Sequence, residues 1–196
     1  MTHDSTVLVS ADLPAASTND AMFFVVSIRK LIVMNIFTLG FYWVYWFYQN
    51  WSRYRSKSGE RVLPLVRTFF GILFLHGLLS RVDRQLRVAG HHHEWSPFWL
   101  TCAFILIVGF TAWANCLIQT MPSLHLGAVL LNVAGFWLLA RMQRAINLCA
   151  GDPEGQSNSR LSVWNWAWMS PGILLWIVIA AVGVVLTLAV LTEIPL

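Results

Sequence analysis

Three long apolar runs constrain the fold of this chain more than any other feature. They lie at Phe98–Ile118, Leu124–Ala140 and Ile173–Leu191, and polar stretches separate them. The first and last have the length of about 20 residues that an α-helix needs to cross the hydrocarbon core of a bilayer. Hydrophobic residues make up 57% of the chain and charged residues only 11%, which is hard to reconcile with a surface in water. We therefore expect an integral membrane protein of the all-α class.

Prolines mark the starts of most of the predicted helices. Four apolar segments have a proline in their first turn, where its missing N–H costs nothing: Pro64, Pro97, Pro122 and Pro171. Serine precedes Pro97 and Pro171 and is a favourable N-cap. The predicted helices cover 24–56, with a break near Thr38–Gly40, then 64–89, 97–119, 122–149 and 170–192.

The first residues do not resemble a targeting signal. Residues 1–22 contain no Lys or Arg, whereas a secretory signal peptide begins with a basic region. We expect a flexible, uncleaved tail at 1–22 and one membrane domain at 23–196. The three cysteines, Cys102, Cys116 and Cys149, have no metal-ligand spacing and are expected to be buried thiols.

The distribution of basic residues favours a topology in which two segments turn back. Cytoplasmic flanks of membrane segments carry an excess of Lys and Arg. If all five segments crossed, five of the thirteen basic residues would lie on the opposite side from the rest: Arg53, Arg55, Lys57, Arg61 and Arg67. If the first two segments enter and return, all thirteen share the cytoplasmic side. The stretch Thr68–Ser80 is also too short to span, and Gly40 offers a hinge.

The predicted architecture therefore has three transmembrane helices, at about 97–119, 122–141 and 170–192, with two bent or re-entrant segments on the cytoplasmic side. A five-helix membrane bundle is the alternative. The N-terminus is expected in the cytoplasm and the C-terminus in the periplasm. Interfacial aromatic anchors are expected at the headgroup level: Trp43, Trp46, Trp51, Trp95, Trp99, Trp164, Trp166 and Trp168. A collar for anionic lipids is expected beneath them: Arg53, Arg55, Lys57, Arg84, Arg87, Arg141 and Arg144.

Three stretches carry a resemblance to a known group of proteins. They are VSIRKLIVMNIFTLGFYWVYWFYQNW, RVLPLVRTFFGILF and RMQRAIN. The first resembles uncharacterised bacterial inner-membrane proteins with a T-x-G-x-Y-x-x-Y-W-F-Y-x-N-W pattern. The likeness is specific in the first seventy residues and weaker afterwards. It implies a multi-pass protein of a bacterial inner membrane, and it implies no activity or catalytic residue.

A few polar side chains stand inside the apolar segments. His76 is the ionisable one, and we expect it to bond Asn35 or Asn132 within the bundle. Asn115 and Gln119 share a helix face, and with His76 and Asn132 they form a candidate polar bundle or solute pathway. Asp83 and Arg87 have the spacing of a helical ion pair. A haem between His76 and His125 is disfavoured by their different depths.

The remaining motifs argue against an enzyme. The run His91-His92-His93-Glu94 lacks the metalloprotease spacing, and we interpret it as a solvated or headgroup-facing loop and not as a specific metal site. The chain has no nucleophile elbow, P-loop or dinucleotide fingerprint. The prediction is a non-catalytic accessory or scaffold protein without a cofactor, which engages lipids and another membrane protein or itself but no nucleic acid. A small-solute transport or channel component is the alternative, and a haem-bearing redox subunit is weaker still.

Overall fold

The computed structural model describes residues 21–91, 94–117 and 124–193, and over these ranges all regular structure is helical, which confirms the all-α class. The elements are α1 (Ile28–Phe37), α2 (Tyr42–Ser58), α3 (Pro64–Phe69), α4 (Gly71–Val88), α5 (Pro97–Leu117), α6 (Leu124–Cys149), the short 3-10 turn η1 (Gln156–Asn158) and α7 (Val163–Glu193). Most of the predicted tail, the two central residues of the histidine run, Gln119 and Pro122 lie outside the described residues.

The first predicted segment folds as a helical hairpin with its turn at the expected break. Leu39 and Gly40 take left-handed backbone conformations, with φ of 53° and 87°, and the second is one that glycine adopts without strain. Thr38 joins the two helices, because its Oγ1 donates to Met34 O at 2.7 Å and accepts from Tyr42 N at 2.9 Å. The predicted break near Thr38–Gly40 is confirmed.

The chain that enters this hairpin is extended and not helical. Phe24 N donates to Asn50 Oδ1 at 3.1 Å, and Phe24 O accepts from Gln143 Nε2 at 2.9 Å. Asn147 holds both backbone groups of Val26, at 3.3 Å to N and 3.0 Å to O. Because side-chain amides satisfy these buried groups, the segment needs no helical hydrogen bonds. The predicted helix start at residue 24 is therefore wrong, and α1 begins at Ile28.

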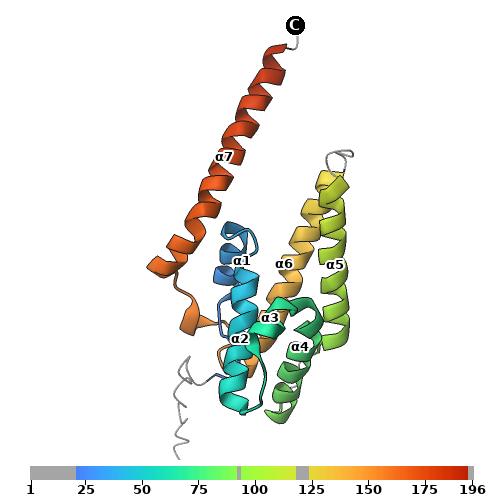
Figure 1. Ribbon diagram of the computed structural model, residues 1–196, viewed down its shortest axis with the longest axis vertical. Coiled ribbons are helices and arrows are strands. Elements are labelled where there is room, and N and C mark those ends of the chain that lie inside the picture. Colours follow the sequence, from blue (N-terminus) through green and yellow to red (C-terminus); the bar gives the residue numbers. More distant parts are fainter. Residues whose placement is uncertain (1–20, 92–93, 118–123, 194–196) are drawn as a thin grey trace, which may run out of the picture.

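This first hairpin, residues 23–58, returns to the level at which it began. The ring of Phe23 stacks on Tyr54 near the end of α2, with ring centroids 5.7 Å apart. In Figure 1 the α1–α2 turn lies beside α6 and the far end of α2 lies at the opposite end of the hairpin. The two ends of this segment consequently share one end of the molecule.

Residues 60–88 form a second hairpin, which sequence analysis treated as one helix. Pro64 begins α3 at its first turn as predicted, but the helix ends at Phe69 and the chain reverses into α4 at Gly71. A Cβ at Gly71 would lie only 3.6 Å from the Phe47 ring, so this turn packs against α2. At the other end Arg81 of α4 reaches Glu60, with 3.3 Å between Nη2 and Oε2.

Three helices are long and apolar enough to cross a membrane: Pro97–Leu117, Leu124–Cys149 and Val163–Ala189. The first two pack against each other as an antiparallel pair, and α7 leans away from them (Figure 1). Among the described helices, α7 contacts only α1. Their mean hydropathy values are 1.9, 1.5 and 2.7, so the least covered helix is also the most apolar.

Helix α7 begins seven residues before the predicted start. Ser162 caps it, because Ser162 Oγ accepts from Asn165 N at 3.3 Å while Asn165 Oδ1 accepts from Ser162 N at 2.9 Å. Pro171 lies inside the helix, so the prediction that Ser170 and Pro171 open it is wrong. Proline removes a helical donor to the carbonyl of Ala167, and Ser170 Oγ donates to that carbonyl instead, at 2.9 Å.

The buried core lies at one end of the molecule. It joins α2, α4 and the second half of α6 around large side chains that include Trp46, Trp51, Leu79 and Met142. The first half of α6, most of α5 and nearly all of α7 extend beyond this core with exposed apolar residues. The fold is thus a packed base from which the three apolar helices project.

Candidate functional site

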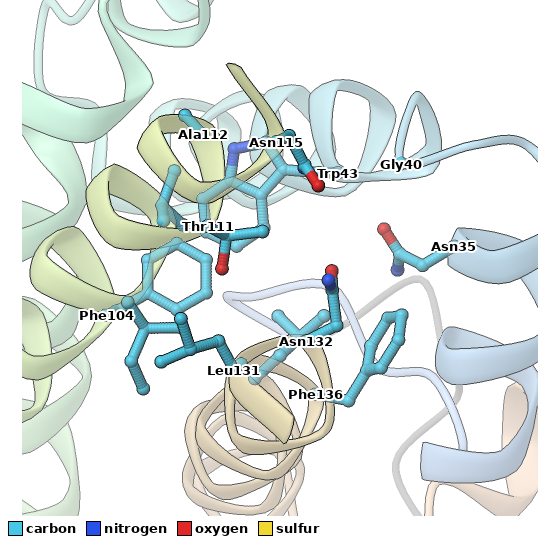
Figure 2. A pocket seen from close by; sticks show the side chains of 14 residues that line it. Asn35, Gly40, Trp43, Phe104, Thr111, Ala112, Asn115, Leu131, Asn132 and Phe136 are labelled. Atoms are coloured by element: carbon cyan, nitrogen blue, oxygen red, sulfur yellow. The ribbon is translucent and has the colours of Figure 1, made fainter. Parts of the chain in front are cut away.

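A cavity of about 350 Å³ lies where the α1–α2 turn meets α5 and α6. Most of its lining is apolar, and four polar side chains reach it: Asn35, Thr111, Asn115 and Asn132. Figure 2 shows Asn35 of α1 and Asn132 of α6 pointing into the same space, with Trp43 and Phe104 on its other side. The cavity therefore brings together polar groups from three separate parts of the sequence.

Hydrogen bonds within the helices orient these side chains. Asn35 Nδ2 donates to Leu31 O and Asn132 Nδ2 donates to Ala128 O, both at 2.8 Å. Each bond uses one of the two amide hydrogens, so one donor and the amide oxygen of each side chain remain for a ligand. Thr111 Oγ1 is buried and has no hydrogen-bond partner among the described residues. The cavity can accept a small neutral polar group, and no charged residue lines it to attract an ion.

The predicted polar bundle is only partly assembled. Asn115 and Asn132 do line one cavity, but His76 does not reach it. His76 lies on the exposed face of α4, where its Nε2 is 3.3 Å from Ser80 Oγ and its ring meets Phe98 edge-on. The predicted bond from His76 to Asn35 or Asn132 is wrong, because α4 presents that side chain away from the α1–α2 turn. Gln119 lies outside the described residues.

Two of the predicted membrane anchors are core residues. Trp46 and Trp51 are completely buried, so neither side chain can contact a lipid headgroup. Trp46 Nε1 donates to Gln143 Oε1 of α6, and Trp51 packs edge-on against Phe47 and Tyr54. Sequence analysis misplaced them because an aromatic run looks alike whether its partner is lipid or protein.

The other six predicted anchors lie nearer the surface. Trp43 stacks between Trp46 and Phe104, and Trp95 Nε1 donates to Asp83 Oδ1 at 2.9 Å, so both are tied to the packed base. The remaining four have more than half of their surface exposed: Trp99, Trp164, Trp166 and Trp168. Their role at the membrane interface stays a prediction.

Arginines and one glutamate close the base of the second hairpin. Glu60 pairs with Arg81 at 3.3 Å and with Arg84 at 3.8 Å, and Tyr54 OH donates to its Oε1. The hydrogen bond from Tyr54 is the main reason that the pKa of Glu60 is lowered, and the two arginines act in the same direction. Arg67 and Arg81 also lie over the Trp51 ring, with 4.0 Å and 5.3 Å from guanidinium carbon to centroid.

The seven residues of the predicted lipid collar have different surroundings. Arg55, Lys57, Arg84, Arg87 and Arg144 are exposed, whereas Arg53 and Arg141 are half-buried. Arg53 lies over the Phe24 ring at 5.1 Å, and Arg141 lies over Trp137 at the same distance. The predicted pair of Asp83 and Arg87 is confirmed, with 2.9 Å between Oδ2 and Nε.

Sequence analysis missed the amide cluster that holds the extended entry segment. Asn50, Gln143 and Asn147 are completely buried, and Gln143 Nε2 also donates to Asn147 Oδ1 at 2.7 Å. Asn158 adds a fourth amide, which donates to Val25 O at 2.9 Å. The available signal was the spacing of Gln143 and Asn147, which places two amides on one face of a helix.

Neither metal geometry nor known proteins assign this site a function. Within the ranges that the structure describes, no three His, Cys, Asp or Glu side chains come together in a way that could hold a metal ion. Comparison of the chain with protein-family models, curated proteins and solved structures finds no match.

Proposed function

We propose that this chain is a non-catalytic protein of the bacterial inner membrane that acts as a scaffold or accessory subunit. Its two hairpins enter the cytoplasmic leaflet and return, and α7 provides the surface for another membrane protein or a second copy. The N-terminus is then cytoplasmic and the C-terminus periplasmic. The observation that carries this proposal is that both hairpins have an apolar turn at one end and basic residues at the other.

Each hairpin has an apolar, exposed turn and a charged opposite end. The first turn exposes Leu39 and Phe41, the latter by 70%, and the second exposes Phe69 by 84% and Leu73 by 75%. Large apolar side chains concentrated at two turns are costly in water and favourable in hydrocarbon. The opposite ends carry most of the basic residues: Arg53, Arg55, Lys57, Arg81, Arg84 and Arg87. Arg67 lies near the second turn, where its guanidinium carbon is 4.0 Å from the Trp51 ring centroid and 5.3 Å from that of Phe74. This arrangement supports insertion of the turns with the charges left at the membrane surface.

The depth of the first turn supports entry into one leaflet. Gly40 at this turn and Asn132 of α6 line the same cavity, so they lie at a similar level. Asn132 precedes the basic Arg141 by nine positions, which corresponds to roughly 14 Å along α6, or about half of a hydrocarbon core of about 30 Å. Hydrogen bonds within the hairpin satisfy backbone amides of the turn at that depth, because Gly40 N donates to Asn35 O at 2.7 Å and Phe41 N donates to Thr38 O at 3.0 Å.

The scaffold role is supported by the few contacts that α7 makes with the rest of the described protein. This helix touches only α1 among the described helices, through a close approach of Gly172 to Phe37 and a bond of 3.3 Å from Trp176 Nε1 to Ile36 O. Beyond these contacts its side chains are largely exposed, including Val182 and Val185. Such a helix can pack against a second membrane protein without disturbing the base.

Site-specific photo-crosslinking tests this role. A benzophenone side chain placed at Val185 on α7 and, as a matched control, at Leu106 on α5 would probe two positions with similar exposure of 64% and 60%. We expect a discrete protein adduct from Val185 and none from Leu106, and its mass identifies a different protein or a second copy. The absence of any adduct, together with a clean monomer in mild detergent, would contradict the scaffold role.

A small-solute transport component is the second candidate, and the cavity between the hairpin turn and α5–α6 favours it. Asn35, Asn115 and Asn132 could relay a neutral polar solute at membrane depth. Solute flux into reconstituted vesicles should then fall on replacement of Asn132 by leucine and persist on replacement of the distant His76 by alanine. Equal flux in both variants would remove this candidate.

A further inference from the structure

Two adjoining cavities form one groove between the first hairpin and the start of α7. The larger, of about 390 Å³, contains three basic residues in its lining: Lys30, Arg53 and Arg160. The smaller, of about 220 Å³, is lined mainly by apolar and aromatic side chains. Both cavities share four residues: Tyr42, Tyr45, Ser162 and Asn165. The groove thus has a cationic end and an aromatic end.

The cationic end contains a buried ammonium group whose hydrogen-bond partners are neutral. Lys30 is only 7% exposed, and its Nζ donates to Asn158 Oδ1 at 2.7 Å and to Arg160 O at 2.8 Å. An ammonium group has three donors, so one remains available. None of the described residues that line this cavity is acidic. Burial of a cation is unfavourable without an anion nearby, which makes this end a receptor for negative charge.

Asp152 lies in the loop before α7, and its carboxylate accepts hydrogen bonds within that loop. Its oxygens accept from Ser157 N at 2.9 Å, from Ser157 Oγ at 2.6 Å and from Gln156 N at 2.9 Å. Those bonds fix the loop before α7, which carries Asn158 and Arg160 into the groove. Asp152 therefore helps to set the positions of Asn158 and Arg160 in the groove.

The aromatic end extends toward the apolar turn of the first hairpin. It is lined by Thr38 and Phe41 at that turn and by Trp164 and Trp168 at the start of α7. Phe41 and Trp168 are each 70% exposed and Trp164 is 77% exposed. The direction from cations to aromatic residues is the same as the direction from the charged ends of the hairpins to their apolar turns.

We infer that this groove binds one anionic phospholipid, with its phosphate at Lys30, Arg53 and Arg160 and an acyl chain along Phe41 and Trp168. The order of charge and apolar surface in the groove matches the order of headgroup and chain in a lipid of the cytoplasmic leaflet. Phosphate suits a site with two arginines and a lysine, since guanidinium groups bind its oxygens through paired hydrogen bonds. The inference goes beyond the scaffold role and requires no protein partner.

Binding can be measured on the purified full-length protein in detergent, by thermal shift and native mass spectrometry. The probes are dioctanoyl-phosphatidylglycerol, dioctanoyl-phosphatidylcholine and inorganic phosphate. Arg160→Gln is the main variant, because the side chain is exposed and only its backbone oxygen bonds Lys30. Arg61→Gln removes an exposed arginine that lies outside both the groove and the predicted lipid collar, and it is the matched control. Trp168→Ala tests the aromatic end.

We expect phosphatidylglycerol to bind the native protein and the Arg61 variant equally. Arg160→Gln should weaken it about tenfold, the usual effect of one lost charge-assisted hydrogen bond. Trp168→Ala should lower the affinity for phosphatidylglycerol and leave the affinity for inorganic phosphate unchanged. The site would be overturned if phosphatidylglycerol bound the Arg160 and Arg61 variants with equal affinity, or if phosphatidylcholine bound the native protein as tightly as phosphatidylglycerol. If inorganic phosphate bound as tightly as phosphatidylglycerol and Trp168→Ala changed neither affinity, the groove would be a site for free anions and the lipid assignment would be wrong. These results are independent of any crosslink from α7.

Discussion

Replacement of Asn147 by leucine should destabilise the protein strongly, because this amide holds the extended segment in the core. Asn147 bonds both Val26 N and Val26 O, and its side chain is completely buried. Leucine has a similar size but leaves both backbone groups without a partner. Each unsatisfied buried group costs about 1–3 kcal/mol, so we expect a loss of about 2–6 kcal/mol in the free energy of unfolding.

The assay is thermal unfolding in detergent micelles, followed by circular dichroism. For a chain of this size a loss of 1 kcal/mol lowers Tm by about 2–4 °C, so the expected shift lies between about 4 and 24 °C. Asn132→Leu is the matched control, since Asn132 Nδ2 bonds only a carbonyl of its own helix, Ala128 O. Equal unfolding temperatures of the two variants would mean that the bonds from Asn147 to Val26 do not stabilise the fold.

Two further predictions concern the packing of α7 and the charged base. Gly172→Val should detach α7 from α1, because a Cβ at Gly172 would lie 1.8 Å from Phe37 O. Gly183→Val is the control, since a Cβ at Gly183 meets nothing within 4 Å. The yield of a disulfide engineered between α1 and α7 measures the difference between the two variants. Glu60 has a lowered pKa in the folded protein, chiefly through Tyr54, so its stabilisation is complete above the usual glutamate pKa of about 4.3 and is lost as pH falls through the lower folded value. Glu60→Gln should remove that part of the acid-induced loss of stability. The pairing would be contradicted if the stability of the variant fell with decreasing pH, below the usual glutamate pKa, as much as that of the native protein.

Local signals predicted the parts of the fold that depend on neighbours in the sequence. Gly40 marked the first turn because few other residues adopt its backbone conformation without strain. Pro97 marked the start of α5, where Ser96 Oγ accepts from Trp99 N at 3.4 Å. The pair of Asp83 and Arg87 followed from helical spacing alone.

The parts that sequence analysis missed depend on distant partners. Residues 24–27 read as the start of a helix, and only the amides of Asn50, Gln143 and Asn147 make an extended chain stable there. The error at Pro171 has a local cause, because the hydroxyl of Ser170 donates to the carbonyl of Ala167 that the proline leaves free and the helix continues through it. Both errors came from applying a local rule where a neighbouring group supplies the hydrogen bond.

The candidate site was predicted in the same uneven way. Asn115 and Asn132 were expected to act together because both interrupt apolar helices, and they line one cavity. His76 was grouped with them on polarity alone, but the second hairpin turns its side chain outward. The groove with Lys30 and Arg160 could not be foreseen, since 130 positions separate the two residues and only the fold brings them together.

The most direct test of the central claim is the side of the membrane on which both hairpins end. In a variant with Cys102, Cys116 and Cys149 replaced, single cysteines at Ser58 and at Glu94 follow the first and the second hairpin. A membrane-impermeant maleimide should label both in inside-out vesicles and neither in intact spheroplasts. Labelling of either position from the periplasmic side would mean that a hairpin crosses the bilayer, and the proposed arrangement would be wrong.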